Sequence, residues 1–206
     1  MTKATEKSTG GAATKRQILE AALETLKRDG FAGASSRAIA RAGGFNQALI
    51  FYHFGSLDGL LLAALDQTSE ERLERYRQAV GDAASVDELV AAVARLYAED
   101  RERGHMTVVA QMVAGSAAHP ELKPALVARM EPWVTLCEEA IEKGFRWLGL
   151  PELLPREDLA YAFVTFYLGV NLMTQLDEDR ARTDALFERL ESVAPLLASL
   201  RIPADG

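Results

Sequence analysis

The chain has 206 residues, of which 49% are hydrophobic and 26% are charged, and it carries a formal net charge of -7 at pH 7. This composition is that of a soluble globular protein and excludes a disordered or fibrous chain. The single cysteine, Cys137, excludes an internal disulfide and a cysteine-rich metal site, as is typical of a protein from a reducing compartment.

The chain begins with a polar segment, and we expect residues 1–13 to form a flexible arm. The sequence MTKATEKSTGGAATKR lacks the apolar core of a secretion signal. Residues 1–55 contain eight Lys/Arg and four Asp/Glu, whereas the remainder contains fifteen and twenty-six. A basic front end on an acidic body favours a local surface for a polyanion, although chance clustering of a few surface charges gives the same imbalance.

A long helix and two short ones are predicted to follow the arm. Apolar residues recur every three or four positions between Ile18 and Leu26, which predicts a first helix that Gly30 can end. Capping residues and a glycine pair then punctuate two shorter helices. Ser35 or Ser36 is expected to cap the second helix, Gly43-Gly44 to form the turn, and Asn46 to cap the third helix. The three expected helices cover residues 14–30, 35–42 and 46–53.

The rest of the chain keeps the same helical spacing, without a sustained strand-like alternation. Ser85 is placed to cap a helix with Glu88 as its capping-box partner. Further helices are expected at residues 56–80, 85–104, 106–118, 121–148, 156–178 and 182–200. The predicted fold is therefore all-α, with about nine helices in total.

Two short helices joined by a glycine turn and braced by a helix on each side form a helix-turn-helix, which presents a recognition helix to the major groove. We expect Ile39, Phe45, Ile50 and Phe54 to meet the apolar face of the first helix, which turns Gln47 and its neighbours outward. Gln47 can pair with an adenine edge, and Leu49 can touch a thymine methyl. The predicted domains are a three-helix helix-turn-helix domain, residues 14–60, and a larger helical domain for ligand binding and dimerisation, residues 61–206.

Phosphate contacts need hydroxyl groups and cations, which set register without reading sequence. Single residues also have structural explanations, since Ser35 and Ser36 can act only as helix caps and His53 can be an exposed residue without a role. The candidate DNA-binding residues are Lys15, Arg16, Ser35, Ser36, Arg37, Asn46, Gln47, Ala48, Leu49, Tyr52, His53 and Ser56.

Residues 15–61, KRQILEAALETLKRDGFAGASSRAIARAGGFNQALIFYHFGSLDGLL, resemble the DNA-binding segment of TetR-family regulators. The distinctive pieces are Gly30-Phe31, Ser35-Ser36 and the run Phe51–Phe54 before Gly55-Ser56. Two departures concern groups that family members commonly direct at DNA. Leu57 stands where lysine is usual, and Phe51 where tyrosine is frequent. These changes put the contact set in doubt but not the motif.

The predicted helix 156–178 is apolar almost all round and must be covered on both sides. A membrane span is the first alternative, but polar residues interrupt the stretch and no basic bias flanks it. We expect it to pack in its own subunit and against a twofold partner, together with the last helix, as the resemblance implies. The predicted interface residues are Val164, Leu168, Leu172, Leu186, Leu190, Val193 and Leu197.

A small-molecule pocket is expected between these helices and the DNA-binding end, where Pro132 can bend a helix and open a cavity. Plain core packing is the alternative for each residue. With no Arg or Lys cluster among the likely pocket positions, a mostly apolar effector is the default. The predicted lining is Tyr97, Met106, Val109, Met112, Met130, Trp133, Cys137, Phe163, Phe166, Tyr167 and Asn171.

The sequence therefore predicts a cytoplasmic, homodimeric, ligand-responsive DNA-binding transcription regulator. The resemblance implies a repressor, released from a pseudo-palindromic operator by its effector. No catalytic residue, metal or cofactor is expected, because the three histidines lie in different segments and neither a phosphate loop nor a nucleophile elbow is present. The alternatives are a helical-bundle enzyme and an interaction module without DNA binding, which the changes at Leu57 and Phe51 make conceivable.

Overall fold

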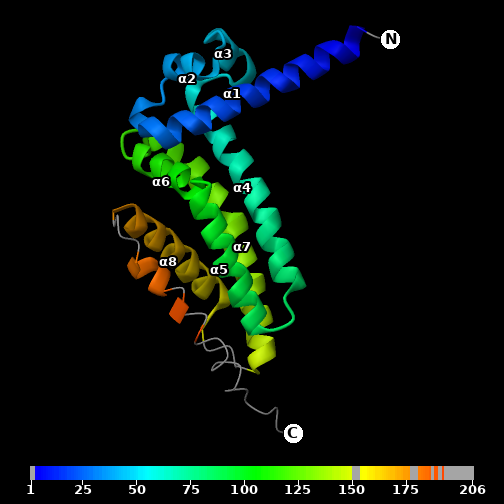
Figure 1. Cartoon of the computed structure of the whole chain (residues 1–206), viewed down its shortest axis with the longest axis vertical. Helices are drawn as coiled ribbons and strands as arrows, with labels where there is room; N and C mark the ends of the chain where they lie inside the picture. The colour runs from blue at the N-terminus through cyan, green and yellow to red at the C-terminus, as the bar shows by residue number, and fades with distance from the viewer. Residues whose placement is uncertain (1–2, 150–153, 177–180, 187, 190–191, 193–206) are drawn as a thin grey trace. The chain divides into compact units, whose positions relative to one another are not determined.

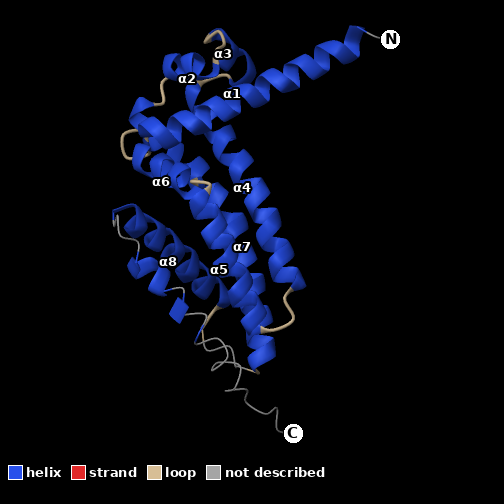
Figure 2. Cartoon of the chain, in the orientation of Figure 1, coloured by secondary structure: helices blue, strands red, loops and turns tan. Residues whose placement is uncertain are grey.

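The structure is a computed structural model that describes residues 3–149, 154–176, 181–186, 188–189 and 192. Within these residues it contains eight α-helices, one 3-10 helix and no strand, which confirms the predicted all-α class (Figure 2). The helices are α1 Lys3–Gly33, α2 Ser36–Gly43, α3 Ala48–Phe54, α4 Leu57–Asp82, α5 Val86–Glu102, α6 His105–Gly115, η1 Pro120–Leu122, α7 Lys123–Leu148 and α8 Arg156–Leu176 (Figure 1). Residues 181–186 are also helical, and most of the predicted last helix lies outside the described residues.

Helix α1 begins earlier than the sequence predicts. The backbone is helical from Lys3, where we expected a polar arm up to residue 13. Adding a residue to a formed helix gains one hydrogen bond without a new nucleation cost, so the packed turns after Thr14 can propagate the helix backward. The regular part of α1 ends at Gly30 as predicted, because Gly30 has φ 71° and interrupts the helix before a short final turn that reaches Gly33.

Side-chain caps set several helix starts as predicted. Ser35 Oγ accepts a hydrogen bond from the Ala38 amide at 3.2 Å at the start of α2. At the start of α5, Ser85 Oγ accepts from the Glu88 amide at 3.2 Å, and the Glu88 carboxylate accepts from the Ala84 amide at 2.8 Å. The capping box is thus formed, with its return bond one residue earlier than the standard pattern.

The backbone groups into two compact units. Unit 1 comprises Met1–Glu70 and Gly104–Ala128, and unit 2 comprises Glu71–Arg103 and Arg129–Gly206. Helices α4 and α7 each contribute residues to both units. These units are defined by backbone contacts and not by function. The predicted boundary at residue 60, between a DNA-binding domain and a domain for ligand binding and dimerisation, therefore stays a prediction.

The core of unit 1 forms where α1 packs against α2 and α6. Ile18 and Leu26 on α1, Ile39 on α2 and Ile50 on α3 are all completely buried. Of the four residues predicted to meet the first helix, Ile39 and Ile50 are therefore fully buried, whereas Phe45 and Phe54 are half-buried. Burying each aliphatic side chain contributes about 1.5–3 kcal/mol, so the burial of Ile50 stabilises the position of α3.

The core of unit 2 centres on Tyr76, Val80, Leu96 and Leu136. The Trp133 ring packs edge to face against Tyr76, with 5.6 Å between the ring centroids. Lys143 links α7 to the last residues of α4, because its ammonium group donates to the carbonyl oxygens of Val80 and Gly81 at 2.7 Å each. Pro132 lies inside α7, which continues through it.

Helix α8 buries a narrow stripe and leaves apolar side chains exposed. Ala160, Asn171 and Thr174 are buried, whereas Tyr161, Leu172, Met173 and Leu176 are at least half exposed. In the described part of the chain no single helix is long and apolar enough to cross a membrane, and only the pair α3 and α4, bent by 65°, meets that test on length and composition.

Candidate nucleic-acid interface

The turn between α2 and α3 depends on two adjacent glycines. Gly44 has φ 68° and ψ 33°, a left-handed conformation that costs other residues about 1–2 kcal/mol. A Cβ at Gly43 would lie 2.3 Å from the Phe45 ring and 2.8 Å from the Ala21 Cβ. The first glycine therefore allows close packing, and the second allows the change of direction.

Replacing Gly43 by alanine is expected to destabilise the protein by about 1–3 kcal/mol, because both the Phe45 ring and α1 must move. Thermal unfolding monitored by circular dichroism measures the effect. Gly144→Ala is the matched control, since a Cβ at Gly144, inside α7, meets nothing within 4 Å. That control is expected to stabilise by roughly 0.5–1 kcal/mol. Equal midpoints for the two variants would contradict the close packing at Gly43.

Helix α3 turns one residue inward and several outward. Ile50 is buried, whereas Tyr52 is 81% exposed and Phe51 is 48% exposed. Gln47 is exposed, and Leu49 is half-buried rather than fully outward. The Asn46 carboxamide oxygen accepts from the Ala48 amide at 2.8 Å and so helps to start this helix, as predicted. Tyr52 therefore presents an apolar ring and a hydroxyl group to solvent from a helix of seven residues, and both groups are available to a binding partner.

A hydrogen bond links the two short helices. The Gln47 side-chain nitrogen donates to Ser36 Oγ at 2.8 Å. An amide NH2 group has two donors and the amide oxygen is an acceptor, so this bond leaves Gln47 able to engage both the donor and the acceptor of an adenine edge. Ser36 therefore orients the predicted base-reading side chain.

Cationic and hydroxyl groups lie on the same unit as α3. Lys15, Arg16 and Arg37 are exposed, and the Lys15 ammonium sits 5.6 Å from the centroid of the Phe54 ring. His53 is half-buried and packs edge to face against Tyr52, with ring centroids 4.9 Å apart. Exposed Ser56 accepts from the Gly59 amide at 2.9 Å. All twelve predicted DNA-binding residues belong to unit 1, and their contact with DNA stays a prediction.

The predicted pocket residues divide between the two units. Met106, Val109 and Met112 are buried in unit 1, and the other eight belong to unit 2. In unit 2, Tyr97 and Asn171 are buried, and Met130, Trp133, Cys137 and Tyr167 are half-buried. Phe163 and Phe166 are 44% and 43% exposed, so in the single chain they face outward more than we expected.

A buried ion network lies among these residues, and sequence reasoning missed it. Arg72 Nε donates to the Asp100 carboxylate at 2.6 Å, and Arg75 donates to the other Asp100 oxygen at 2.6 Å. The Arg72 guanidinium lies 4.7 Å from the centroid of the Trp133 ring, and it donates to Tyr167 Oη at 3.4 Å. Arg72 and Asp100 occupy the apolar three-four spacing of α4 and α5, which indicates that both are buried but does not identify them as partners.

Burial shapes the protonation of this region. Burial alone would lower the pKa of Arg72, but the adjacent Tyr167 and Asp100 raise it above its ordinary value. Desolvation raises the pKa of the Tyr167 phenol and raises the pKa of the Cys137 thiol to about 11. At neutral pH the guanidinium is therefore charged, whereas the phenol and the thiol are neutral.

The predicted dimer residues are only partly described. Val164, Leu168 and Leu186 are half-buried, and Leu172 is 50% exposed. Leu190, Val193 and Leu197 lie outside the described residues. Of the four described, Leu172 is the one with substantial surface for a second chain.

Comparison with known sequences shows that the N-terminal segment is similar to one family. Residues 18–64 match the family described as "Bacterial regulatory proteins, tetR family". The chain is 28% identical over 113 residues to the HTH-type transcriptional regulator UidR of Escherichia coli K12. That alignment covers 55% of this chain and 57% of the relative, so the chain spans little more than half the length of this curated relative.

Comparison with solved structures extends over most of the chain. A putative transcriptional regulator from Saccharomonospora viridis in complex with choline has a TM-score of 0.73 at 21% identity, covering 88% of this chain and 95% of that one. The regulator FadR from Bacillus subtilis in complex with stearoyl-CoA has a TM-score of 0.70 at 13% identity, covering 93% and 99%. At these identities the likeness is one of fold.

Proposed function

We propose that this chain, whose residues 18–64 match the TetR family of bacterial regulatory proteins, is a cytoplasmic transcription regulator that binds operator DNA through α3 and leaves it when a small molecule binds. The observation that carries the proposal is the exposure of Gln47, which directly precedes α3, and of Tyr52 on α3, whose other side is anchored by fully buried Ile50. A rigid short helix with outward polar and aromatic groups is suited to the major groove. The direction of regulation is repression.

Twofold symmetry supplies the second recognition helix. The exposed apolar side chains of α8, among them Leu172 and Leu176, form a surface that a second copy of the chain would cover. A dimer of this kind binds half-sites about 10–10.5 base pairs apart, or a multiple of that spacing, and the operator is then pseudo-palindromic.

The proposed effector site lies in unit 2, among Tyr97, Trp133, Tyr167 and Asn171. Trp133 packs against the core formed by Tyr76, Val80, Leu96 and Leu136, which supports a mostly apolar effector. The Arg72–Asp100 pair beside Tyr167 and Trp133 adds hydrogen-bonding groups, so an effector with a polar end fits better than a pure hydrocarbon. The fold neighbours in complex with stearoyl-CoA and choline support a small-molecule effector for a chain of this fold.

Footprinting on DNA that flanks the coding sequence, with and without effector, tests the proposal. The expected result is protection of two symmetric half-sites, which is lost on adding compounds that raise the thermal midpoint of the free protein. The compounds are a panel of apolar molecules together with stearoyl-CoA and choline. Protection that no stabilising compound reverses would contradict the effector role. A stable protein that protects no DNA would favour the interaction module, and turnover of a bound compound would favour the enzyme.

A further inference from the structure

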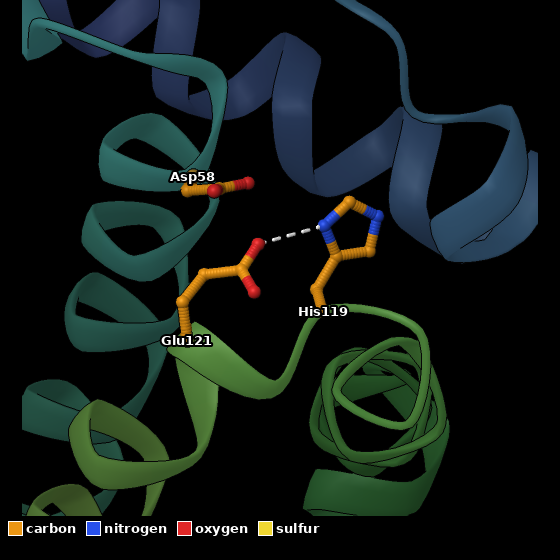
Figure 3. A group of neighbouring side chains, drawn as sticks. All are labelled: Asp58, His119 and Glu121. Atoms are coloured by element: carbon orange, nitrogen blue, oxygen red, sulfur yellow. Dashed lines mark hydrogen bonds and ion pairs between the residues drawn. The ribbon is translucent and has the colours of Figure 1, made fainter.

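Three potential metal ligands from two separate segments converge in unit 1. Asp58 lies in the first turn of α4, whereas His119 and Glu121 flank the start of η1 (Figure 3). One ligand atom from each residue can be chosen so that all three lie within 4.8 Å of one another. Figure 3 shows the Asp58 and Glu121 carboxylates and the His119 ring directed toward the same space. The grouping was not evident from sequence, because sixty-one positions separate Asp58 from His119.

Neighbouring contacts hold the imidazole in place. The His119 ring packs against Phe31, with 5.4 Å between ring centroids and an interplanar angle of 58°. Phe31 is itself fixed, because its amide donates to the Gln111 side-chain oxygen at 3.0 Å and its ring touches the backbone at Gly115, where a Cβ would lie 2.3 Å from the ring. The imidazole is therefore oriented by a residue outside the cluster.

The two ligands of the η1 segment are already close. His119 Nδ1 lies 3.1 Å from Glu121 Oε1. Without a bound cation, this pair forms an ordinary exposed hydrogen bond.

We propose that Asp58, His119 and Glu121 bind a divalent transition-metal ion of the zinc class. One imidazole nitrogen and two carboxylate oxygens match the mixed donor sets of zinc sites with three protein ligands, water completing the coordination. Tetrahedral ligands at about 2.0–2.2 Å from zinc lie roughly 3.4 Å apart, a separation that the His119–Glu121 pair already approaches. Small side-chain rotations of Asp58 complete the set. Magnesium and calcium, which prefer all-oxygen ligands, bind less well here.

A bound ion would join two parts of unit 1 that are not continuous in sequence. It would tie the first turn of α4, which follows α3 after Gly55 and Ser56, to the segment that leads from α6 into α7. The ion would therefore stabilise the folded arrangement of these segments by its differential binding to that state. This inference does not depend on the proposed DNA-binding function.

Titration of the full-length protein with ZnCl2 in an isothermal calorimeter tests the site. One Zn2+ per chain is expected, with a rise in the thermal midpoint that MgCl2 does not produce. His119→Ala and Asp58→Asn should each weaken binding by at least about tenfold, since losing even an outer-shell partner of a metal ligand costs that much. The matched control is Glu70→Gln, which removes an exposed carboxylate on the same helix α4 outside the cluster.

Two results would overturn the proposal. The first is the absence of saturable Zn2+ binding by a folded protein. The second is Zn2+ binding that His119→Ala and Asp58→Asn leave as tight as Glu70→Gln does, which would place the ion elsewhere on the chain. Circular dichroism of each variant separates loss of the site from loss of the fold, and Glu121→Gln provides a further variant with a side chain of the same shape.

Discussion

Asp100→Asn is expected to lower the free energy of unfolding by about 3–5 kcal/mol, because it leaves a buried cation without its counter-charge. Asp100 is completely buried, and the Arg72 side chain is 4% exposed. The asparagine keeps the shape of the side chain, but it offers Arg72 one neutral oxygen and presents an NH2 group to the second arginine. Urea unfolding followed by circular dichroism measures the loss.

Glu99→Gln is the matched control for this change. It removes the other carboxylate that Arg75 contacts, at 2.9 Å, but both of those side chains reach solvent, with 25% of Arg75 and 40% of Glu99 exposed. Exposed pairs of this kind contribute about 0–1 kcal/mol. If Asp100→Asn costs no more than Glu99→Gln, the network is not buried in the folded protein as described.

Gln47→Ala is expected to weaken operator binding by about 1–3 kcal/mol for each half-site, the usual worth of a bidentate contact between an amide side chain and adenine. The loss should be confined to specific DNA, because an amide contributes no charge to phosphate binding. Fluorescence anisotropy with operator and with scrambled DNA measures both affinities. Equal losses on the two DNAs would contradict base reading by Gln47.

Lys15→Ala should give a different pattern. Removing a phosphate contact weakens binding to all sequences alike and reduces the slope of log affinity against log salt by about one for each bound chain. Arg146→Ala is the control for loss of a positive charge, since Arg146 is an exposed residue of unit 2 that pairs with Glu142 at 3.1 Å. It should leave both the affinity and the slope unchanged.

The parts of the fold that local chemistry governs could be predicted from sequence. The apolar spacing of Ile18 and Leu26 predicts the buried face of the first helix, and Ser35 and Ser85 supply predicted caps. Asn46 accepts from the Ala48 amide, although the N-cap residue of α3 is Gln47. At the end of α2, Gly44 has a left-handed backbone and Gly43 has no room for a Cβ. These features are local, so they can be read from a short stretch of chain.

The parts that depend on distant contacts could not be predicted. The Arg72–Asp100 pair joins α4 to α5, and a charged residue on an apolar stripe does not reveal its partner. Asp58 and His119 are brought together only by the packing of unit 1. The start of α1 at Lys3 was not predicted either. Gly10 and Gly11 disfavour a helix in this segment, but α1 runs through both of them.

The most direct test of the central claim, that α3 reads operator DNA, is anisotropy of the full-length protein on fluorescent DNA from upstream of its coding sequence, at 50 to 200 mM salt. We expect affinity for that DNA to exceed affinity for scrambled DNA by at least about a thousandfold. We also expect it to fall by roughly 10³–10⁵ across the salt range. Equal affinity for both DNAs, or the absence of binding by the folded protein, would contradict the account.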